Sequence, residues 1–159
     1  TGTTLAVNAP HGEFHLRTSA GPMICIAGGS GLAPLLSLLE DARKKRVKRK
    51  CVLLFGARSE ADLYALDQVK SIQQGWQDGF EFIPVLSAEA EGSAWTGKRG
   101  MVTDFIEGAG SGATWSEIEG YMCGPPVMID AAIAKLTSLG VGLHAIHYDK
   151  FTDMSHSDK

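Results

Sequence analysis

The chain contains only three cysteines in 159 residues, and no two of them form a CxxC pair. A zinc or iron–sulfur site within this chain is therefore not expected, because such sites need clustered thiolates at short spacings. Cys25 and Cys51 fall in apolar runs, where we expect them to be buried as small hydrophobic residues. An odd cysteine count without pairing spacings is typical of a reducing compartment, so we expect a cytoplasmic protein.

The chain also lacks long apolar runs and an excess of charge of either sign. No stretch approaches the ~20 apolar residues that a membrane-spanning helix needs, and the small, polar N-terminus does not read as a signal peptide. Lys and Arg number 15 against 18 Asp and Glu, for a net charge of −3, so neither nucleic acid nor a membrane is expected as a partner. The basic run 43–50 is interpreted as a solvated helix end. The chain does not begin with Met, and we expect a fragment of a longer protein.

What the sequence does contain is an alternation of strand and helix patterns. Strands are predicted where short apolar runs end at glycine or a polar residue, and helices where apolar residues recur every three or four positions. The alternation indicates an α/β fold, a five-stranded parallel sheet with helices on both faces. Pro84 predicts that the third strand lies at or near an edge. The strands are predicted at 23–27, 51–57, 80–86, 119–123 and 143–148, and the helices at 32–46, 62–75, 101–107 and 126–139.

A glycine turn, Gly28-Gly29-Ser30-Gly31, joins the first predicted strand to the first helix. The start of a helix carries unpaired N–H groups and a partial positive charge, and glycines let a phosphate approach them. Ser30 is expected to cap the helix, and Pro34 fits its first turn. The spacing differs from the GxGxxG motif of the Rossmann fold. The second predicted strand also does not end in the acidic residue that a Rossmann dehydrogenase has there, so another dinucleotide-binding fold is favoured. A plain strand-to-helix turn without a ligand remains the alternative.

A second turn, Cys123-Gly124-Pro125-Pro126, repeats this order of strand, turn and helix. The two prolines fix φ at the helix start, and Gly124 opens space above the strand. Two interpretations of Cys123 stay open: a buried structural residue, or a thiol that points from the strand end into a cleft beside a flat ring. Because no partner such as His is near in sequence, a nucleophilic role is not implied. Two such turns at strand carboxyl ends favour a ligand with two ends, such as a dinucleotide.

Five segments in one order give the chain a resemblance to a known family. They are Gly28–Pro34, Phe55–Ser59, Val85–Ser87, Tyr121–Pro126 and Tyr148–Phe151. Together they resemble the pyridine-nucleotide domain of the ferredoxin–NADP reductase superfamily. Within it, the chain looks most like the reductase components of bacterial multicomponent oxygenases, such as phenol hydroxylase and methane or toluene monooxygenases. The resemblance covers about residues 5–151.

The resemblance implies a role for each matching residue. The first glycine turn would hold the pyrophosphate, Arg58 and Ser59 would flank the adenosine ribose, and the turn at 123–125 would lie beside the nicotinamide. Phe151 would stack on the flavin ring and yield to the nicotinamide before hydride transfer. The expected catalytic residues are Cys123 and Phe151, and the expected cofactor-binding residues are Gly28, Gly29, Ser30, Gly31, Pro34, Arg58, Ser59, Ser87, Gly124, Pro125 and Pro126.

The same resemblance implies the organisation of the whole protein. Residues 1–18 would be the last hairpin of a flavin-binding β-barrel, 19–151 the NAD(P)-binding domain, and 152–159 a disordered tail. FAD and a 2Fe–2S centre are expected on missing domains, so this fragment alone should be inactive. The expected partners are the flavin-binding domain of the same protein and a ferredoxin domain or oxygenase component.

The function implied is hydride transfer from NADH to a flavin, followed by electron transfer to an oxygenase. Arg58 could pair with the 2′-phosphate of NADPH, and Tyr64 remains a possible contact to it. Glu60, Asp62 and Asp67 follow, however, and would repel that phosphate, so NADH is favoured. The alternative is a stand-alone nucleotide-binding module without enzymatic activity, because glycine turns on parallel sheets are common to many such folds.

Overall fold

The computed structural model describes residues 14–19, 21–110 and 112–151. Of the stretch 1–18, expected as a barrel hairpin, only residues 14–18 are described, and they form no strand. The expected tail at 152–159 lies outside the described residues. Within the part of the chain that is described, no helix has the length and apolar character required to span a bilayer.

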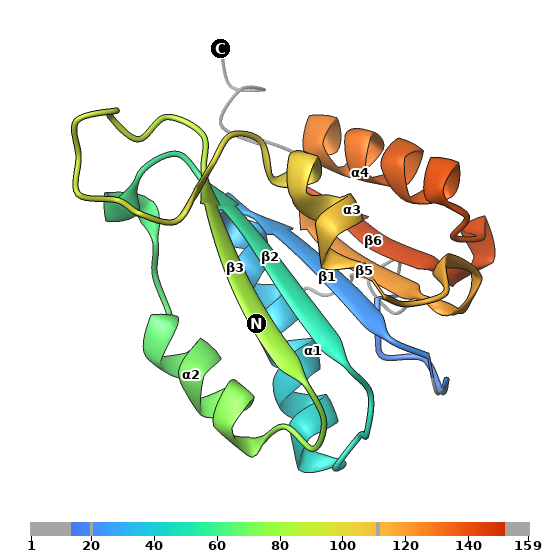
Figure 1. The fold of residues 1–159 in the computed structure, drawn as a ribbon. Helices are drawn as coiled ribbons and strands as arrows, with labels where there is room; N and C mark the ends of the chain where they lie inside the picture. Colours follow the sequence, from blue (N-terminus) through green and yellow to red (C-terminus); the bar gives the residue numbers. More distant parts are fainter. Residues whose placement is uncertain (1–13, 20, 111, 152–159) are drawn as a thin grey trace, which may run out of the picture.

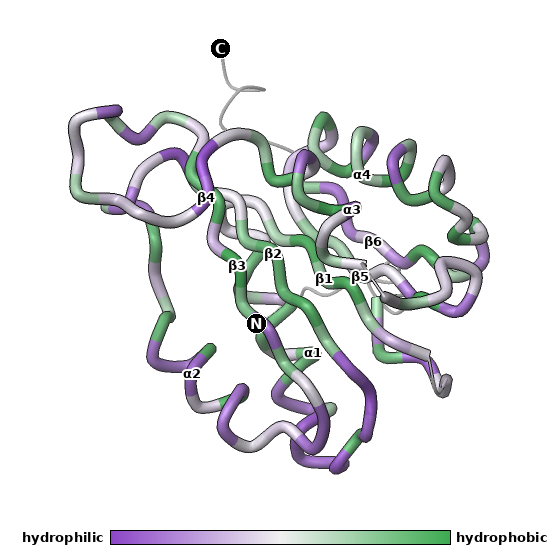
Figure 2. The backbone as a smooth tube through the Cα atoms, viewed as in Figure 1, coloured by the Kyte–Doolittle hydropathy of each residue, from purple (hydrophilic) through white to green (hydrophobic). Residues whose placement is uncertain are grey.

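The centre of the fold is a parallel sheet of six strands in the order β4-β3-β2-β1-β5-β6 (Figure 1; β4 is labelled in Figure 2). The predicted α/β parallel sheet is therefore confirmed, but it has one strand more than expected. The extra strand has only two residues, both exposed, and lies between the predicted strand 80–86 and the predicted helix 101–107, where no strand was expected. The strands are β1 (Met23–Gly28), β2 (Cys51–Ala57), β3 (Phe80–Leu86), β4 (Lys98–Arg99), β5 (Glu119–Gly124) and β6 (Ile146–Lys150).

Helices cover both faces of the sheet, as the alternating pattern predicts. The helices α1 and α2 pack on one face, and α3 and α4 pack on the other (Figure 1). Among the residues that the structure describes, short 3-10 turns occupy five of the connections. The helices are α1 (Leu32–Lys44), α2 (Leu66–Gly75), α3 (Ile106–Ala109) and α4 (Pro126–Leu139). The 3-10 turns are Gly29–Gly31, Glu60–Asp62, Val102–Phe105, Trp115–Glu117 and Leu143–Ala145.

The first strand is buried along its whole length because it lies between β2 and β5 with helices above and below. Its side chains alternate between two hydrophobic clusters: Met23, Cys25 and Ala27 join the cluster under α1, and Ile24 and Ile26 join the cluster under α4. This two-sided burial explains why the sequence shows a continuous apolar run here rather than an alternating pattern. In Figure 2 the central strands are accordingly hydrophobic, while the connection from α1 to β2 is strongly hydrophilic.

The strand order reverses at β1, and this reversal creates the place for a ligand. The chain moves from β1 through β2 and β3 to β4, and then returns to the other side of β1 to form β5 and β6. In such sheets a crevice forms beyond the carboxyl ends of the strands at the switch point. Here Ala27 of β1 pairs with Cys123 of β5, so the two glycine turns that follow are neighbours. At Pro84, β3 has no partner strand on its outer side because β4 pairs only with Val85 and Leu86, as the proline predicts.

Candidate functional site

A cavity of about 800 Å³ lies at the carboxyl ends of β1, β2 and β3, beside the start of α4. Its walls come from segments far apart in the sequence, which only the parallel sheet brings together. Most of the wall is apolar, with Arg58 and Asp62 as its charged residues. The lining residues are Gly28, Gly29, Ser30, Ala33, Gly56, Ala57, Arg58, Asp62, Tyr64, Ser87, Gly100, Met101, Val102, Pro125 and Met128.

Four residues of the two glycine turns, Gly28, Gly29, Ser30 and Pro125, form the floor of this cavity, and the turns pack against each other. A Cβ atom at Gly31 would overlap the carbonyl oxygen of Cys123, so only glycine lets these backbones approach so closely. A Cβ atom at Gly28 would lie 2.6 Å from the sulfur of Met128 and 3.1 Å from Cδ of Pro125. Gly29, in contrast, has a left-handed φ of +54° and open space around it. The glycines therefore serve two purposes, which are close backbone packing and an unobstructed surface for a ligand.

The N-terminus of α1 faces this floor and carries no local cap. The N-cap residue is Gly31, and the expected cap by the Ser30 hydroxyl is wrong, because no side chain of the turn caps this end. Pro34 removes one N–H group from the first turn, and that of Leu32 donates to the carbonyl oxygens of Gly29 and Ser30; the remaining N–H groups of the helix start are not capped by a side chain of the turn. Such groups, with the helix dipole, favour an anion at this position.

The end of β2 forms the opposite wall, and a capping box shapes it. The backbone N–H and the hydroxyl of Ser59 both donate to Oδ2 of Asp62, at 3.1 Å each. This short turn explains why α2 begins at Leu66 rather than at 62 as expected. Arg58 and Asp62 are exposed at the cavity, so a ligand there meets one positive and one negative group.

Cys123 lies under the floor and does not open into the cavity. Its side chain is fully buried in the cluster beneath α1, which agrees with the interpretation as a buried structural residue and not with a thiol that points into the cavity. Burial, with a smaller effect from the Asp149 carboxylate, raises the pKa of Cys123 to about 12. The thiol is therefore protonated at neutral pH.

Phe151 directly follows β6 and packs against the same cluster as Cys123. Its backbone N–H donates to the carbonyl oxygen of Gly124 at 2.8 Å, which fixes its place beside the second turn. Phe151 and Phe14 are only partly buried, so they leave aromatic surface available at the edge of this cluster. The two expected catalytic residues are thus brought together, on the α1 side of the sheet rather than in the cavity wall.

The cavity wall divides the expected binding residues into two groups. Those that line it are Gly28, Gly29, Ser30, Arg58, Ser87 and Pro125. Those that do not are Gly31, Pro34, Ser59, Gly124 and Pro126, which belong to the surrounding turns, and Pro34 instead borders a groove beside Phe14. Sequence reasoning missed the wall formed by Gly56, Gly100, Met101, Val102 and Met128. Among these residues, only Gly56 could have indicated this wall from the sequence, because a glycine inside a strand marks a close approach by another segment. In the structure that segment is at Val102, whose Cβ would lie 3.0 Å from a Cβ atom added at Gly56.

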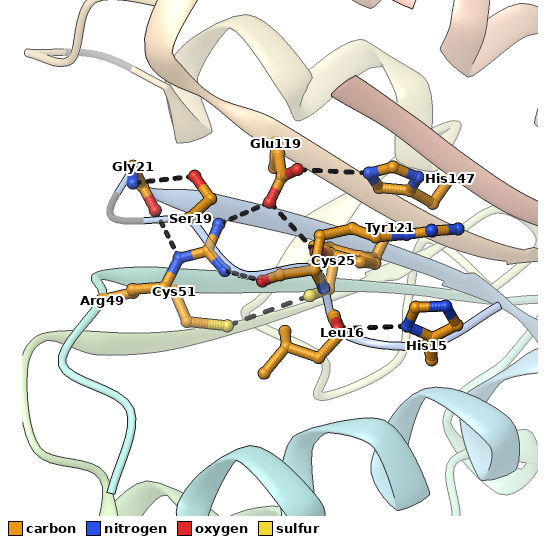
Figure 3. Close-up of polar contacts among 11 residues, drawn as sticks. His15, Leu16, Ser19, Gly21, Cys25, Arg49, Cys51, Glu119, Tyr121 and His147 are labelled. Carbon is orange, nitrogen blue, oxygen red and sulfur yellow. Dashed lines mark hydrogen bonds and ion pairs between the residues drawn. The ribbon is translucent and has the colours of Figure 1, made fainter. Parts of the chain in front are cut away.

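At the other ends of the strands lies a polar cluster around Arg49 (Figure 3). Arg49 is 3% exposed and donates to Glu119 at 2.8 Å, and to the carbonyl oxygens of Gly21 at 2.7 Å and Arg17 at 3.2 Å. Glu119 also accepts a hydrogen bond from Tyr121 and contacts His147 at 3.2 Å. Burial tends to raise the pKa of Glu119, but these hydrogen bonds outweigh it and the pKa is lowered. The cluster ties Arg17 and Gly21 to the sheet and has a structural role.

A second cavity, of about 440 Å³, also lies at the amino ends of the strands. It is lined by residues such as Lys50, Phe80 and Glu81 and has no glycine turn at a helix start. Ligands of open parallel sheets bind at the carboxyl ends, so the cavity at the glycine turns is the candidate site.

Comparison with known proteins identifies the family of the chain. A family model described as the oxidoreductase NAD-binding domain matches residues 25–133. The electron transfer component of xylene/toluene monooxygenase from Pseudomonas putida is 45% identical over 151 residues, which are 95% of this chain and 42% of that protein. The reductase subunit of aromatic O-demethylase from Amycolatopsis is 38% identical and covers 97% of this chain and 46% of that protein. The chain thus spans less than half the length of these relatives.

Solved structures show the same fold. The Amycolatopsis cytochrome P450 reductase GcoB has a TM-score of 0.75 and 36% identity, covering 87% of this chain and 41% of that chain. The ferredoxin reductase of carbazole 1,9a-dioxygenase has a TM-score of 0.73 and 25% identity, covering 87% of this chain and 40% of that chain. The resemblance to the ferredoxin–NADP reductase superfamily is confirmed, and the chain belongs to the oxidoreductase NAD-binding domain family.

Proposed function

We propose that this chain is the NADH-binding part of a reductase component that passes a hydride from NADH to a flavin. From the flavin, electrons would pass through an iron–sulfur centre to an oxygenase. The observation that carries the proposal is the meeting of two glycine turns, at the ends of β1 and β5, on one cavity of about 800 Å³. The relatives, which are electron transfer and reductase components of oxygenases, support the same role.

The floor of the cavity suits a coenzyme in an extended conformation. Its diphosphate would lie at the N-terminus of α1, where Gly29 leaves open space and N–H groups point outward. Its adenosine would extend toward Arg58 and the apolar wall of Met101 and Val102. Its nicotinamide would extend the other way, over the second turn toward Phe151.

The residues of this chain would act by position rather than by acid–base chemistry. The Cys123 thiol, with its pKa raised to about 12 by burial, holds its proton at neutral pH and is not a nucleophile. Hydride transfer needs the two rings ~3–3.5 Å apart and water excluded. The backbone hydrogen bond from Phe151 to Gly124 holds Phe151 beside the second turn, where its ring would limit how closely a nicotinamide approaches.

Phe14 and Phe151 are both partly buried against the same hydrophobic cluster, and a flavin on a neighbouring domain would stack on their exposed aromatic surface. When bound, it supplies a two-electron acceptor that can release electrons singly.

The charges at the end of β2 favour NADH over NADPH. Asp62 lies in the cavity wall, and its carboxylate would repel a 2′-phosphate beside Arg58. Replacing Asp62 with Asn keeps an acceptor for Ser59 but removes the charge. Removing one repulsion of about 1 kcal/mol between exposed charges corresponds to about a five-fold change in affinity.

A titration followed by NADH fluorescence, with NADPH and ATP as competitors, tests the proposal. We expect NADH to bind more tightly than either competitor, and Asp62→Asn to improve NADPH affinity about five-fold while NADH affinity is unchanged. Asp67→Asn is the matched control, because Asp67 is exposed on α2 and does not line the cavity. Equal affinity for ATP and NADH would contradict the proposal and favour a nucleotide-binding module without enzymatic activity.

A further inference from the structure

Among the methionines that the structure describes, Met101 is the exposed one, and it lines the candidate cavity. It is 58% exposed, whereas Met23 is 1% and Met122 is 0% exposed. Met128, on the other side of the cavity, is partly buried. An oxidant in the solvent therefore reaches Met101 more easily than the other three, and it reaches it at the wall where a ligand would lie.

Hydrogen bonds fix the backbone that carries Met101. The N–H group of Gly100 donates to the carbonyl oxygen of Leu86 at 2.9 Å, and the N–H group of Met101 donates to Oδ2 of Asp104 at 3.1 Å. The 3-10 turn Val102–Phe105 follows directly. Met101 is thus a built part of the cavity wall, and most of that wall is apolar.

We propose that Met101 is a modification site, where hydrogen peroxide oxidises the thioether to the sulfoxide and thereby lowers the affinity of the cavity for the coenzyme. This inference rests on the proposed function, which puts the adenosine against Met101. In the reaction a lone pair of the sulfur attacks one peroxide oxygen, the O–O bond breaks and an S–O bond forms. The sulfur is oxidised by two electrons, and the peroxide is reduced to water. Methionine sulfoxide reductases reverse the change.

The effect on binding follows from the polarity of the sulfoxide. A thioether offers an adenine ring a soft apolar contact, whereas a sulfoxide oxygen is a hydrogen-bond acceptor that water solvates in the free protein. A base that covers this oxygen removes its water, which weakens binding because the lost hydrogen bond is not replaced. We expect the affinity for ligands that carry adenosine to fall at least about five-fold.

Calorimetric titration of this chain with ADP-ribose, before and after hydrogen peroxide, tests the inference, and peptide mass spectrometry locates the added oxygen. Met154, outside the described residues, is the matched control. In the wild type and in Met154→Leu, Met101 should gain one oxygen atom while Met23 and Met122 stay reduced, and ADP-ribose affinity should fall at least about five-fold. Methionine sulfoxide reductase should restore it. For Met101→Leu, the affinity measured before peroxide should be the affinity measured after it.

The possible failures separate this inference from the proposed function. If Met101 stays reduced in peroxide, it is not a modification site. If Met101 is converted to the sulfoxide but ADP-ribose affinity is unchanged, or if Met101→Leu loses as much affinity as the wild type, the effect on binding is wrong while the proposed function stands. If the wild type does not take up ADP-ribose at millimolar concentration before peroxide, the proposed function fails and this inference fails with it.

Discussion

Replacing Gly31 with Ala should separate the two glycine turns and weaken both the fold and coenzyme binding. The backbone of Gly31 has φ −65° and ψ −12°, which any residue adopts, so conformational preference alone would favour Ala by about 1 kcal/mol. The added Cβ atom, however, would overlap the carbonyl group of Cys123 and lie 3.0 Å from the backbone nitrogen of Gly124. Because both neighbours are backbone atoms of a buried strand end, neither can rotate away.

The magnitude follows from these opposing effects. Overpacking of a rigid site lowers the free energy of unfolding by up to about 3 kcal/mol. The higher helix propensity of Ala than of Gly offsets about 1 kcal/mol of this loss. We therefore expect Gly31→Ala to lose about 2 kcal/mol in the free energy of unfolding, measured by urea denaturation. NADH affinity should fall at least about ten-fold, because a loss of about 1.4 kcal/mol in binding free energy through misalignment of the floor is enough for that change.

Gly108→Ala is the matched control for this substitution. Gly108 lies in α3, and a Cβ atom there would meet nothing within 4 Å. This variant should keep wild-type affinity and be equally or slightly more stable. If Gly31→Ala keeps both wild-type stability and wild-type NADH affinity, the contact between the two turns does not build the site.

Three further predictions concern the surroundings of the site. Glu119→Gln should cost about 3 kcal/mol at pH 7, because it leaves buried Arg49 without a charged partner. Because the pKa of Glu119 is lowered in the folded protein, its carboxylate stabilises the fold above the unfolded pKa, and this stabilisation is lost as the pH falls through the folded pKa. The difference in free energy of unfolding between Glu119→Gln and the wild type should therefore shrink from about pH 7 to about pH 3 in urea titrations. A difference that stays constant over this range would contradict the prediction. The buried Cys25, Cys51 and Cys123 should resist iodoacetamide in the native state at pH 8, as followed by mass spectrometry, and rapid labelling of Cys123 would show that its thiol is open to solvent. Phe151→Ala in the longer protein that carries the proposed flavin domain should change both nicotinamide affinity and the rate of hydride transfer in stopped-flow measurements; if both stay at wild-type values, the proposed stacking role is wrong.

The sequence predicted the parts of the fold that have strong periodic patterns. The run from Met23 reads as a buried strand because both faces of β1 are covered, and the leucines of α1 recur at helical spacing. The two-residue strand β4 has no such pattern, so it was missed. The last strand begins at Ile146 rather than at 143, because Leu143–Ala145 form a 3-10 turn that the apolar content does not reveal.

The site was predictable where backbone geometry demands a residue type, and less so where only tertiary packing decides. The glycine and proline turns could be found because few other residues suit a helix start or a close backbone approach. The burial of Cys123 could not be read from the motif, since it depends on packing from α1 and on the segment around Phe151. The reach of Tyr64 to Gly29 joins positions 35 residues apart, and no local pattern encodes it.

A crystal structure of this chain with NADH bound tests the central claim most directly. The account predicts the diphosphate at the N-terminus of α1 over Gly29, with the adenosine toward Arg58 and the nicotinamide toward the turn after Cys123. Coenzyme bound instead in the cavity at the amino ends of the strands, beside Lys50 and Phe80, would contradict it.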